Sequence, residues 1–158
     1  MQHNEVFLNL ILAHKGLIYK ASRIYTDSRE DQEDLYQEIV LQLWKSFENF
    51  RGEAKITTYM YRVAMNTAIG FLNKSKRQQH IIHKVTLPDL EEEIDVASKE
   101  QSQRLHGAIS QLNVIEKGIV FLFLEGNSYS EIGIITGFTE NNVGTRMSRI
   151  KNKLKEIV

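Results

Sequence analysis

The chain has 158 residues, of which 42% are hydrophobic and 25% are charged, with 20 basic and 20 acidic side chains, one proline and no cysteine. This composition is typical of a folded protein of one ordinary or two small domains, and it excludes collagen-like and largely disordered chains. The lack of cysteine excludes disulfide bonds, thiolate catalysis and Cys-ligated metal sites, so we expect a cytoplasmic protein.

The charges are distributed unevenly along the chain. Residues 51–86 carry seven basic side chains and one acidic, residues 126–158 carry five and three, and residues 87–103 carry one and six. This pattern predicts two basic surfaces within a neutral protein, as in proteins that bind nucleic acid. No apolar run approaches the roughly 18 to 20 residues of a membrane-spanning helix, and the chain starts with polar residues, so we expect neither membrane insertion nor a signal peptide.

The first half of the chain predicts three helices. Apolar residues recur at helical spacing over residues 6–25, which predicts one long helix, and a second stripe predicts a helix that includes residues 35–47 and ends near Asn49. The third expected helix covers about residues 55–73. Several large aromatic side chains are expected in the core, although the last of them could instead face a partner: Phe7, Trp44, Phe47, Phe121 and Phe123.

A strip of polar and aromatic side chains lies along one side of the third expected helix. Tyr59, Arg62 and Asn66 are spaced three and four residues apart, so they share one side of the helix, and the strip leads into the basic residues Lys74 and Lys76. An ordinary solvated face would show the same spacing. The adjoining positive charge makes this strip the first candidate ligand surface.

Residues 79–103 form the expected linker between an N-terminal domain (1–78) and a C-terminal domain (104–158). This segment has weak periodicity, the only proline and a cluster of acidic residues. The cluster either is solvated or holds the two basic domains together in the free protein. His80 and His83 have the spacing of a metal-binding pair, but no third ligand is suitably placed, so we expect no metal and no other cofactor.

The last third of the chain predicts a helix-turn-helix. Gly126 can stop a helix, and Ser128 and Glu131 have the spacing of a capping box, so a new helix is expected to start there. It should end at Gly137, and Thr139 should cap a second helix that extends to about residue 154. Two helices joined by a short glycine turn are typical of DNA-binding proteins.

The second of these helices has one apolar and one polar side. Its expected buried stripe consists of Val143, Met147, Ile150 and Leu154. Hydroxyl, amide and guanidinium groups lie at the centre of the opposite face and cations at its edges, which suits contacts to bases and to phosphates respectively. That candidate DNA surface consists of Thr145, Arg146, Ser148, Arg149, Lys151, Asn152 and Lys153.

Two segments resemble the same family in the right order. The motifs Asp34-Leu35-Tyr36-Gln37-Glu38, Phe50-Arg51-Gly52-Glu53 and residues 59–68 resemble region two of bacterial RNA polymerase sigma factors. Residues 124–154, with Gly126-Asn127-Ser128-Tyr129-Ser130-Glu131, resemble region four. The chain is therefore similar to the small, two-domain sigma factors of the extracytoplasmic-function class, and the fold that we expect is all-α, with two small helical domains joined by an acidic linker.

This resemblance implies a dissociable subunit that binds core RNA polymerase, directs it to promoters and helps to open the DNA. The polymerase contact falls on Asp34, Gln37 and Glu38. The resemblance also implies that the pocket for a base flipped from the minus-ten element falls on Phe50 and Asn66. An aromatic ring for stacking and an amide donor are suited to such a pocket, since they can compensate for unstacking. Further minus-ten contacts are expected from Arg51, Tyr59 and Arg62.

The minus-thirty-five contact that the resemblance implies falls on the polar face of the last helix. Thr145, Ser148 and Arg149 would read bases, with Arg146 and Lys151 near phosphates. Lys153 lies beside the buried stripe, so we expect it to contact a phosphate. The free protein is expected to be a monomer, and whether an anti-sigma factor holds it inactive is left open.

Four positions depart from the family pattern. Gly144 replaces a basic residue, which removes one DNA contact and weakens the helix by about 1 kcal/mol relative to alanine. The other departures are Tyr59 in place of tryptophan, Met65 in place of a basic residue and Asn113 in place of proline.

Three other classes of protein stay open at this point. A dimeric helix-turn-helix repressor would explain the C-terminal domain but not the motifs of residues 34–68. A degenerate sigma-like interaction protein would keep the helices without supporting transcription. An enzyme is not expected, because the sequence shows no Ser/His/Asp array, no phosphate-binding glycine loop and no paired carboxylates in a pocket.

Overall fold

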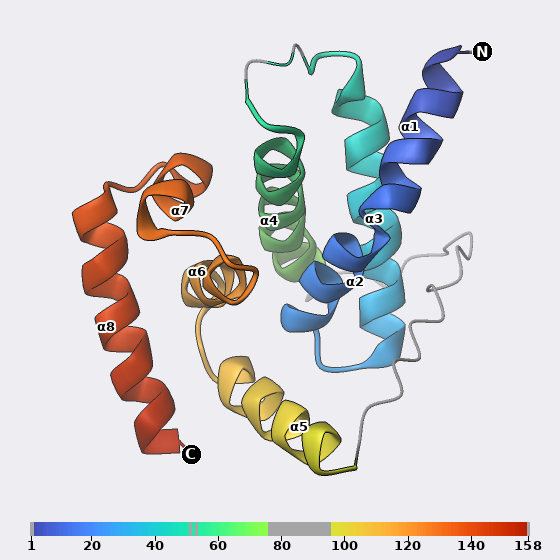
Figure 1. Cartoon of the computed structure of the whole chain (residues 1–158). Coiled ribbons are helices and arrows are strands. Elements are labelled where there is room, and N and C mark those ends of the chain that lie inside the picture. The colour runs from blue at the N-terminus through green and yellow to red at the C-terminus, as the bar shows by residue number, and fades with distance from the viewer. Residues whose placement is uncertain (1, 51, 53, 76–95, 158) are drawn as a thin grey trace. The chain divides into compact units, whose positions relative to one another are not determined.

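The computed structural model describes residues 2–50, 52, 54–75 and 96–157, and all regular secondary structure in these ranges is α-helical (Figure 1). The chain divides into two compact units, unit 1 (residues 1–89) and unit 2 (residues 90–158). The all-α class predicted from the sequence is thus confirmed for the described residues.

Unit 1 contains four described helices: α1 (Gln2–Ala13), α2 (Lys15–Ile24), α3 (Arg29–Phe47) and α4 (Ile56–Ser75). The prediction of a single helix over residues 6–25 is wrong, because the chain leaves the helical conformation at His14, with φ −119° and ψ 20°. The backbone N–H of His14 donates to the Leu10 carbonyl oxygen (3.1 Å), and its Nδ1 lies 3.0 Å from the same oxygen. His14 therefore closes α1, and the two short helices pack separately, α1 against α3 and α2 against both α3 and α4.

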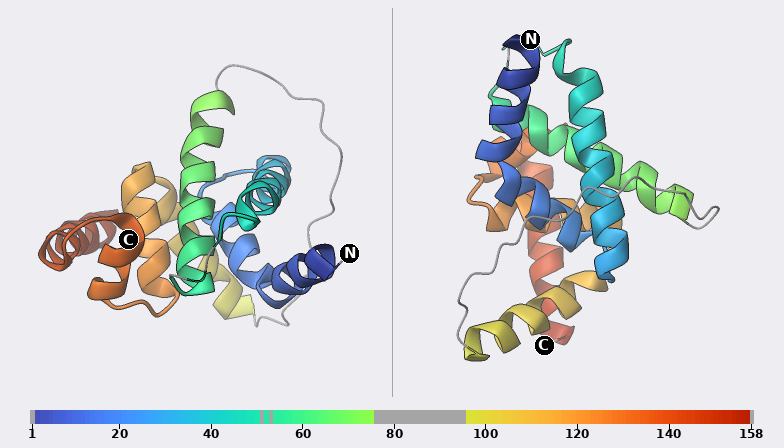
Figure 2. Two further views of the ribbon diagram at one scale, coloured as in Figure 1. Left: turned by 90° about the horizontal axis from the view of Figure 1, so that it is seen from above. Right: turned by 90° about the vertical axis from the view of Figure 1, so that its right-hand side faces the viewer.

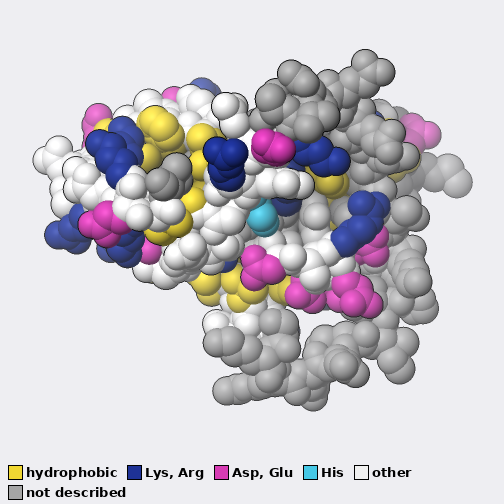
Figure 3. Space-filling model, turned by 90° about the horizontal axis from the view of Figure 1, so that it is seen from below, with side chains coloured by type: hydrophobic (Ala, Val, Ile, Leu, Met, Phe, Trp, Pro, Cys, Tyr) yellow, Lys and Arg dark blue, Asp and Glu magenta, His cyan; other side chains and the backbone are white. Residues whose placement is uncertain are grey.

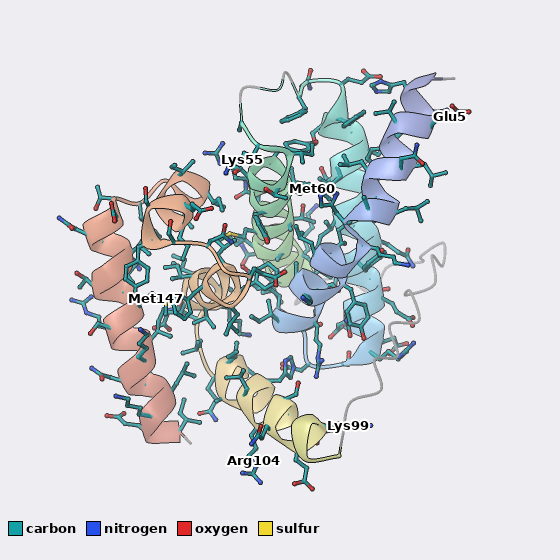
Figure 4. The ribbon with its side chains drawn as sticks, viewed as in Figure 1. Glu5, Lys55, Met60, Lys99, Arg104 and Met147 are labelled. Atoms are coloured by element: carbon teal, nitrogen blue, oxygen red, sulfur yellow. The ribbon has the colours of Figure 1, made fainter. Side chains whose placement is uncertain are left out.

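The core of unit 1 lies between α2, α3 and α4. Leu35, Ile39 and Leu43 recur every four residues on α3 and are fully buried. The facing helix α4 buries Met60, labelled in Figure 4, together with small alanines that allow close approach of the helices.

Two of the five aromatic residues predicted as core are substantially exposed. Trp44 is 41% exposed, because it lies at the edge of the packed α1–α3 pair, which Figure 2 shows side by side. Its ring meets the Phe7 ring edge-on, with centroids 5.0 Å apart. Phe123 in unit 2 is 39% exposed. Phe7 and Phe121 are buried, as expected, whereas Phe47 is only half-buried.

Unit 2 contains α5 (Val96–Ser110), α6 (Val114–Leu124), α7 (Tyr129–Thr136) and α8 (Glu140–Ile157). Helix α5 begins inside the segment 79–103 that was predicted as linker, and the remainder of that linker, with His80 and His83, lies outside the described residues. Met147 on α8, labelled in Figure 4, is buried with Ile119 and Ile150 in the core where α6 and α8 pack.

The helix-turn-helix consists of α7, a turn at Gly137 and α8. The predicted capping box is present at Ser128 and Glu131, Gly137 adopts φ 87°, and the hydroxyl of Thr139 accepts from the backbone N–H of Asn142 (3.1 Å). The turn also brings α7 close to the next segment, since a Cβ on Gly133 would lie only 2.7 Å from the Phe138 carbonyl oxygen. A glycine is therefore required at 133, which sequence periodicity alone does not indicate.

Candidate nucleic-acid interface

The first candidate surface lies on α3. Asp34, Gln37 and Glu38 lie on successive turns of one face and are all half-buried, and the Glu38 Oε1 accepts from the Gln42 Nε2 (3.0 Å). One turn further along the same face, Leu41 is 43% exposed. This face therefore combines acidic and amide groups with an exposed leucine that the sequence analysis did not select.

The second candidate surface begins where α3 ends and α4 starts. The rings of Phe50 and Tyr59 lie against each other, with centroids 4.9 Å apart and planes inclined by 34°. The Tyr59 hydroxyl hydrogen-bonds with the Ser46 hydroxyl and can donate to the Leu43 carbonyl oxygen (3.2 Å). Burial raises the pKa of Tyr59, an effect larger than the lowering by the Ser46 hydrogen bond, so the phenol stays neutral at physiological pH. The Tyr59 ring thus packs against the Phe50 ring, while the Tyr59 hydroxyl points towards α3.

The other minus-ten candidates lie further along α4. Arg62 and Asn66 are exposed and share a face of the helix with Tyr59. Asn66 lies about 10 Å beyond Tyr59 along the helix axis, at about 1.5 Å per residue. Arg51, which the sequence analysis also selected, lies outside the described residues. The structure therefore brings Phe50 and Tyr59 into contact, and it places Arg62 and Asn66 on the same side of α4.

The third candidate surface is the polar face of α8. Thr145, Ser148, Arg149 and Asn152 are exposed, whereas Val143, Met147 and Ile150 are buried, as the periodicity predicts. Leu154, the fourth residue of the predicted buried stripe, is only half-buried because it lies in the last turn of α8. The Thr145 hydroxyl donates to the Asn141 carbonyl oxygen (3.0 Å), which leaves its oxygen lone pairs on the surface. Figure 3 shows basic and acidic side chains interspersed on one face of the molecule.

The cations that flank this face already have partners within unit 2. The Arg146 Nε donates to the Asn142 Oδ1 (2.6 Å), and its guanidinium lies 4.3 Å from the Phe138 ring centroid. The Lys151 Nζ lies 5.2 Å from the centroid of the Phe123 ring.

Lys153 differs from the other two, because its partner is a carboxylate. Its Nζ lies 2.7 Å from the Oε2 of Glu116, a residue 37 positions earlier at the start of α6. Local periodicity gives no sign of so distant a contact, so the sequence analysis missed Glu116.

Glu116 has two structural roles at once. It forms the capping box of α6 with Asn113, where its Oε1 accepts from the Asn113 backbone N–H (3.1 Å), and its Oε2 holds Lys153. Burial raises its pKa, but the Lys153 and Asn113 hydrogen bonds and the charges of Lys153 and Arg146 together outweigh this effect. The pKa of the carboxyl group therefore lies below its ordinary value.

Neither metal ligation nor membrane insertion is indicated in the described part of the chain. Its residues contain no group of three or more His, Cys, Asp or Glu side chains that could hold a metal ion. None of its helices combines the length and apolar character needed to cross a membrane.

Comparisons with known proteins agree with the order of these surfaces. Residues 10–78 match the family model of sigma-70 region 2, and residues 102–154 match that of sigma-70 region 4. The RNA polymerase sigma factor SigV of Bacillus subtilis is 31% identical over 150 residues, which cover 91% of this chain and 86% of SigV. The ECF RNA polymerase sigma-E factor of Haemophilus influenzae is 29% identical over 148 residues, covering 83% of this chain and 78% of that protein.

Two solved structures share the fold. The sigma factor RpoE from Bartonella quintana, in complex with the anti-sigma factor NepR, matches with a TM-score of 0.73 at 18% identity and covers 97% of this chain and 96% of its own. CnrH, in complex with the cytosolic domain of CnrY, matches with a TM-score of 0.70 at 15% identity and covers 98% of this chain and 88% of its own.

Proposed function

The chain belongs to the RNA polymerase sigma factor family, in its extracytoplasmic-function class, and we propose that its two units divide promoter recognition between them. As a sigma factor, it binds core RNA polymerase, directs the enzyme to promoters and promotes DNA melting at initiation. The observation that carries this conclusion is the pair of family matches, to region 2 and to region 4, in the order that the family requires. The proposed domains are residues 1–78 and 104–158, with residues 79–103 as linker.

The polymerase contact is assigned to the α3 face of Asp34, Gln37 and Glu38. These half-buried side chains lie outside the fully buried stripe of Leu35, Ile39 and Leu43, so a partner that contacts them would leave that stripe intact. The exposed Leu41 adds an apolar group to this face, and interfaces of this kind combine an apolar centre with a polar rim.

The minus-ten contact is assigned to Phe50, Tyr59, Arg62 and Asn66, together with Arg51. An unpaired base would stack on Phe50 and meet the Asn66 amide, and stacking on an aromatic side chain contributes about 1–3 kcal/mol per base. Tyr59 contributes by holding the Phe50 ring, since its own hydroxyl is used within unit 1.

The minus-thirty-five contact is assigned to the α8 face of Thr145, Ser148, Arg149 and Asn152. An exposed arginine at the centre of a helix that enters the major groove can pair with a guanine edge. Arg146 and Lys151 lie at the edges, where phosphates would approach. Their present partners are an amide and aromatic rings, which do not neutralise their charge.

Transcription in vitro with core polymerase and genomic DNA tests the proposal. We expect transcripts from specific start sites that are absent with core enzyme alone. Phe50→Ala should reduce permanganate reactivity of the promoter bubble while core binding is kept. Arg149→Ala should cost about 1–3 kcal/mol on the preferred minus-thirty-five sequence and flatten preference at one base pair. An absence of initiated transcripts from every template would instead support a degenerate sigma-like interaction protein.

The remaining assignments follow from this role. The polymerase carries the chemistry, so the chain itself is proposed not to be an enzyme, and it acts where the polymerase acts, in the cytoplasm. Its partners are core RNA polymerase and promoter DNA. A helix-turn-helix regulator that works without polymerase would leave the region 2 match of residues 10–78 unexplained.

A further inference from the structure

Lys153 on α8 and Glu116 at the start of α6 form an ion pair between residues 37 positions apart in unit 2. The side chain of Glu116 is only 11% exposed and that of Lys153 is 53% exposed. Because the Glu116 Oε1 is fixed by the Asn113 backbone, the Oε2 presents a fixed point to which the Lys153 ammonium is held at 2.7 Å.

Besides its apolar packing against α6 and its contacts with α5, α8 has an attachment near each end, and this pair is the second of them. Near its start, the tight turn at Gly133 and Phe138 holds α8 against α7. Near its end, Lys153 holds it to the start of α6, and Ile150 is buried between the two attachments. The base-reading residues lie on the outer side of the helix, between these two points.

The Lys153–Glu116 pair limits how far α8 can tilt, and the tilt decides where Arg149 lies. Arg149 lies ten residues after Thr139, or about 15 Å along the axis at about 1.5 Å per residue. A tilt of about 5° around the turn would move its backbone by roughly 1.3 Å, which exceeds the tolerance of about 0.5 Å within which a functional side chain must be held.

A contact of Lys153 with phosphate would also have an electrostatic cost. Moving the ammonium to DNA would take the closest cation from a mostly buried carboxylate, which costs free energy even though the half-exposed lysine is partly screened by solvent. The phosphate contact that the sequence predicts for Lys153 is therefore disfavoured by the structure.

We propose that Lys153 is a positioning residue, which acts through Glu116 to fix the angle of the recognition helix α8 for minus-thirty-five reading. This inference rests on the proposed function of α8 in promoter recognition. It assigns to Glu116, which faces the interior of unit 2, a role in sequence specificity.

The test compares Glu116→Gln, Lys153→Met and the double variant as holoenzymes. Binding is measured on the preferred promoter and on single-base minus-thirty-five variants, across a salt series. Each single variant should reduce discrimination between the preferred and altered sequences by about tenfold, as for the loss of one base contact. The double variant should be no worse than either single variant, and the salt slope should stay unchanged. Lys153→Arg, which can keep the ion pair, should retain discrimination.

Lys155→Met is the matched control, because it removes the same charge from an exposed position two residues further along α8. A phosphate contact by Lys153 would overturn the inference: Lys153→Met would then weaken all sequences alike and lower the salt slope by about one unit. In that case Glu116→Gln would leave affinity unchanged or raise it. The inference would also be overturned if Glu116→Gln and Lys153→Met lowered thermal stability but left discrimination between minus-thirty-five sequences intact. An inactive wild-type holoenzyme on every promoter would instead contradict the proposed function.

Discussion

Replacement of Gly133 by alanine should disrupt the helix-turn-helix, although alanine is the better helix former. In an open position the change would stabilise a helix by about 1 kcal/mol. Here the new Cβ would lie 2.7 Å from the Phe138 carbonyl oxygen, 3.6 Å from the Glu140 backbone nitrogen and 3.7 Å from the Thr139 carbonyl carbon. All three neighbours are backbone atoms, so no side chain can rotate away to relieve the overlap.

The magnitude follows from these opposing effects. Overpacking typically costs about 1–3 kcal/mol, and a shift of the turn adds loss of the Thr139 cap, so the net effect of Gly133→Ala should be destabilisation by about 1–2 kcal/mol. For a domain of this size the midpoint of thermal unfolding should fall by roughly 4–16 °C. Binding of the holoenzyme to the minus-thirty-five element should weaken too, because the turn sets the start of α8.

Two other glycines of unit 2 provide matched controls. A Cβ on Gly107 in α5 would meet no atom within 4 Å, and a Cβ on Gly144 in α8 would make ordinary contact with the Tyr129 ring at 3.6 Å. Both alanine variants should therefore be as stable as the wild type or more stable. Urea unfolding followed by circular dichroism measures all three. Equal stability of Gly133→Ala and Gly107→Ala would refute the reasoning from close approach.

Three further predictions concern other parts of the molecule. Tyr25 is buried, and its hydroxyl has no hydrogen-bond partner among the described residues, so Tyr25→Phe should raise the free energy of unfolding by about 1 kcal/mol in urea titrations; a loss of stability would show that the hydroxyl is satisfied. Asp34→Lys should weaken core binding at least about tenfold, or ~1.4 kcal/mol, in a binding titration in which the matched change Glu5→Lys on exposed α1 has no effect; equal affinities would remove α3 from the interface. The lowered pKa of Glu116 means that its contribution to stability is complete above its ordinary pKa of 4.5 and is lost as pH falls through the lower folded value. The stability advantage of wild type over Glu116→Gln should thus be constant above pH 4.5 and shrink as the pH falls below 4.5 through the folded pKa, and a constant difference across that fall would contradict this assignment.

Local patterns in the sequence were sufficient for much of unit 2. The capping box at Ser128, the turn at Gly137 and the alternation of buried and exposed residues along α8 all depend on residues a few positions apart. Each was predicted and is present in the structure. The polar face of α8 follows directly from this periodicity, because burial of Met147 and Ile150 turns Ser148 and Arg149 outwards.

Contacts between distant segments decide the features that the sequence did not predict. The break at His14 depends on how α1 and α2 pack against α3 and α4, since the apolar spacing itself continues through the break. Trp44 on α3 is covered on one side by Phe7 of α1, a residue 37 positions earlier, and is otherwise 41% exposed. The hydroxyl of Tyr59 bonds to groups 13 and 16 residues away, and Lys153 pairs with a residue 37 positions earlier. Composition and spacing contain no information on such contacts.

The packing of Trp44 against Phe7 gives the native chain a fluorescent label for one half of the molecule. Trp44 is the only tryptophan of the sequence, and residues 90–158 contain a single aromatic hydroxyl, that of Tyr129. Emission excited selectively from tryptophan therefore follows the contact of α1 with α3, whereas far-ultraviolet circular dichroism sums the helices of both units. Where the unfolding curve from circular dichroism departs from that of tryptophan emission, the departure reports unfolding of unit 2. Unfolding of the helix-turn-helix can therefore be followed without any engineered probe.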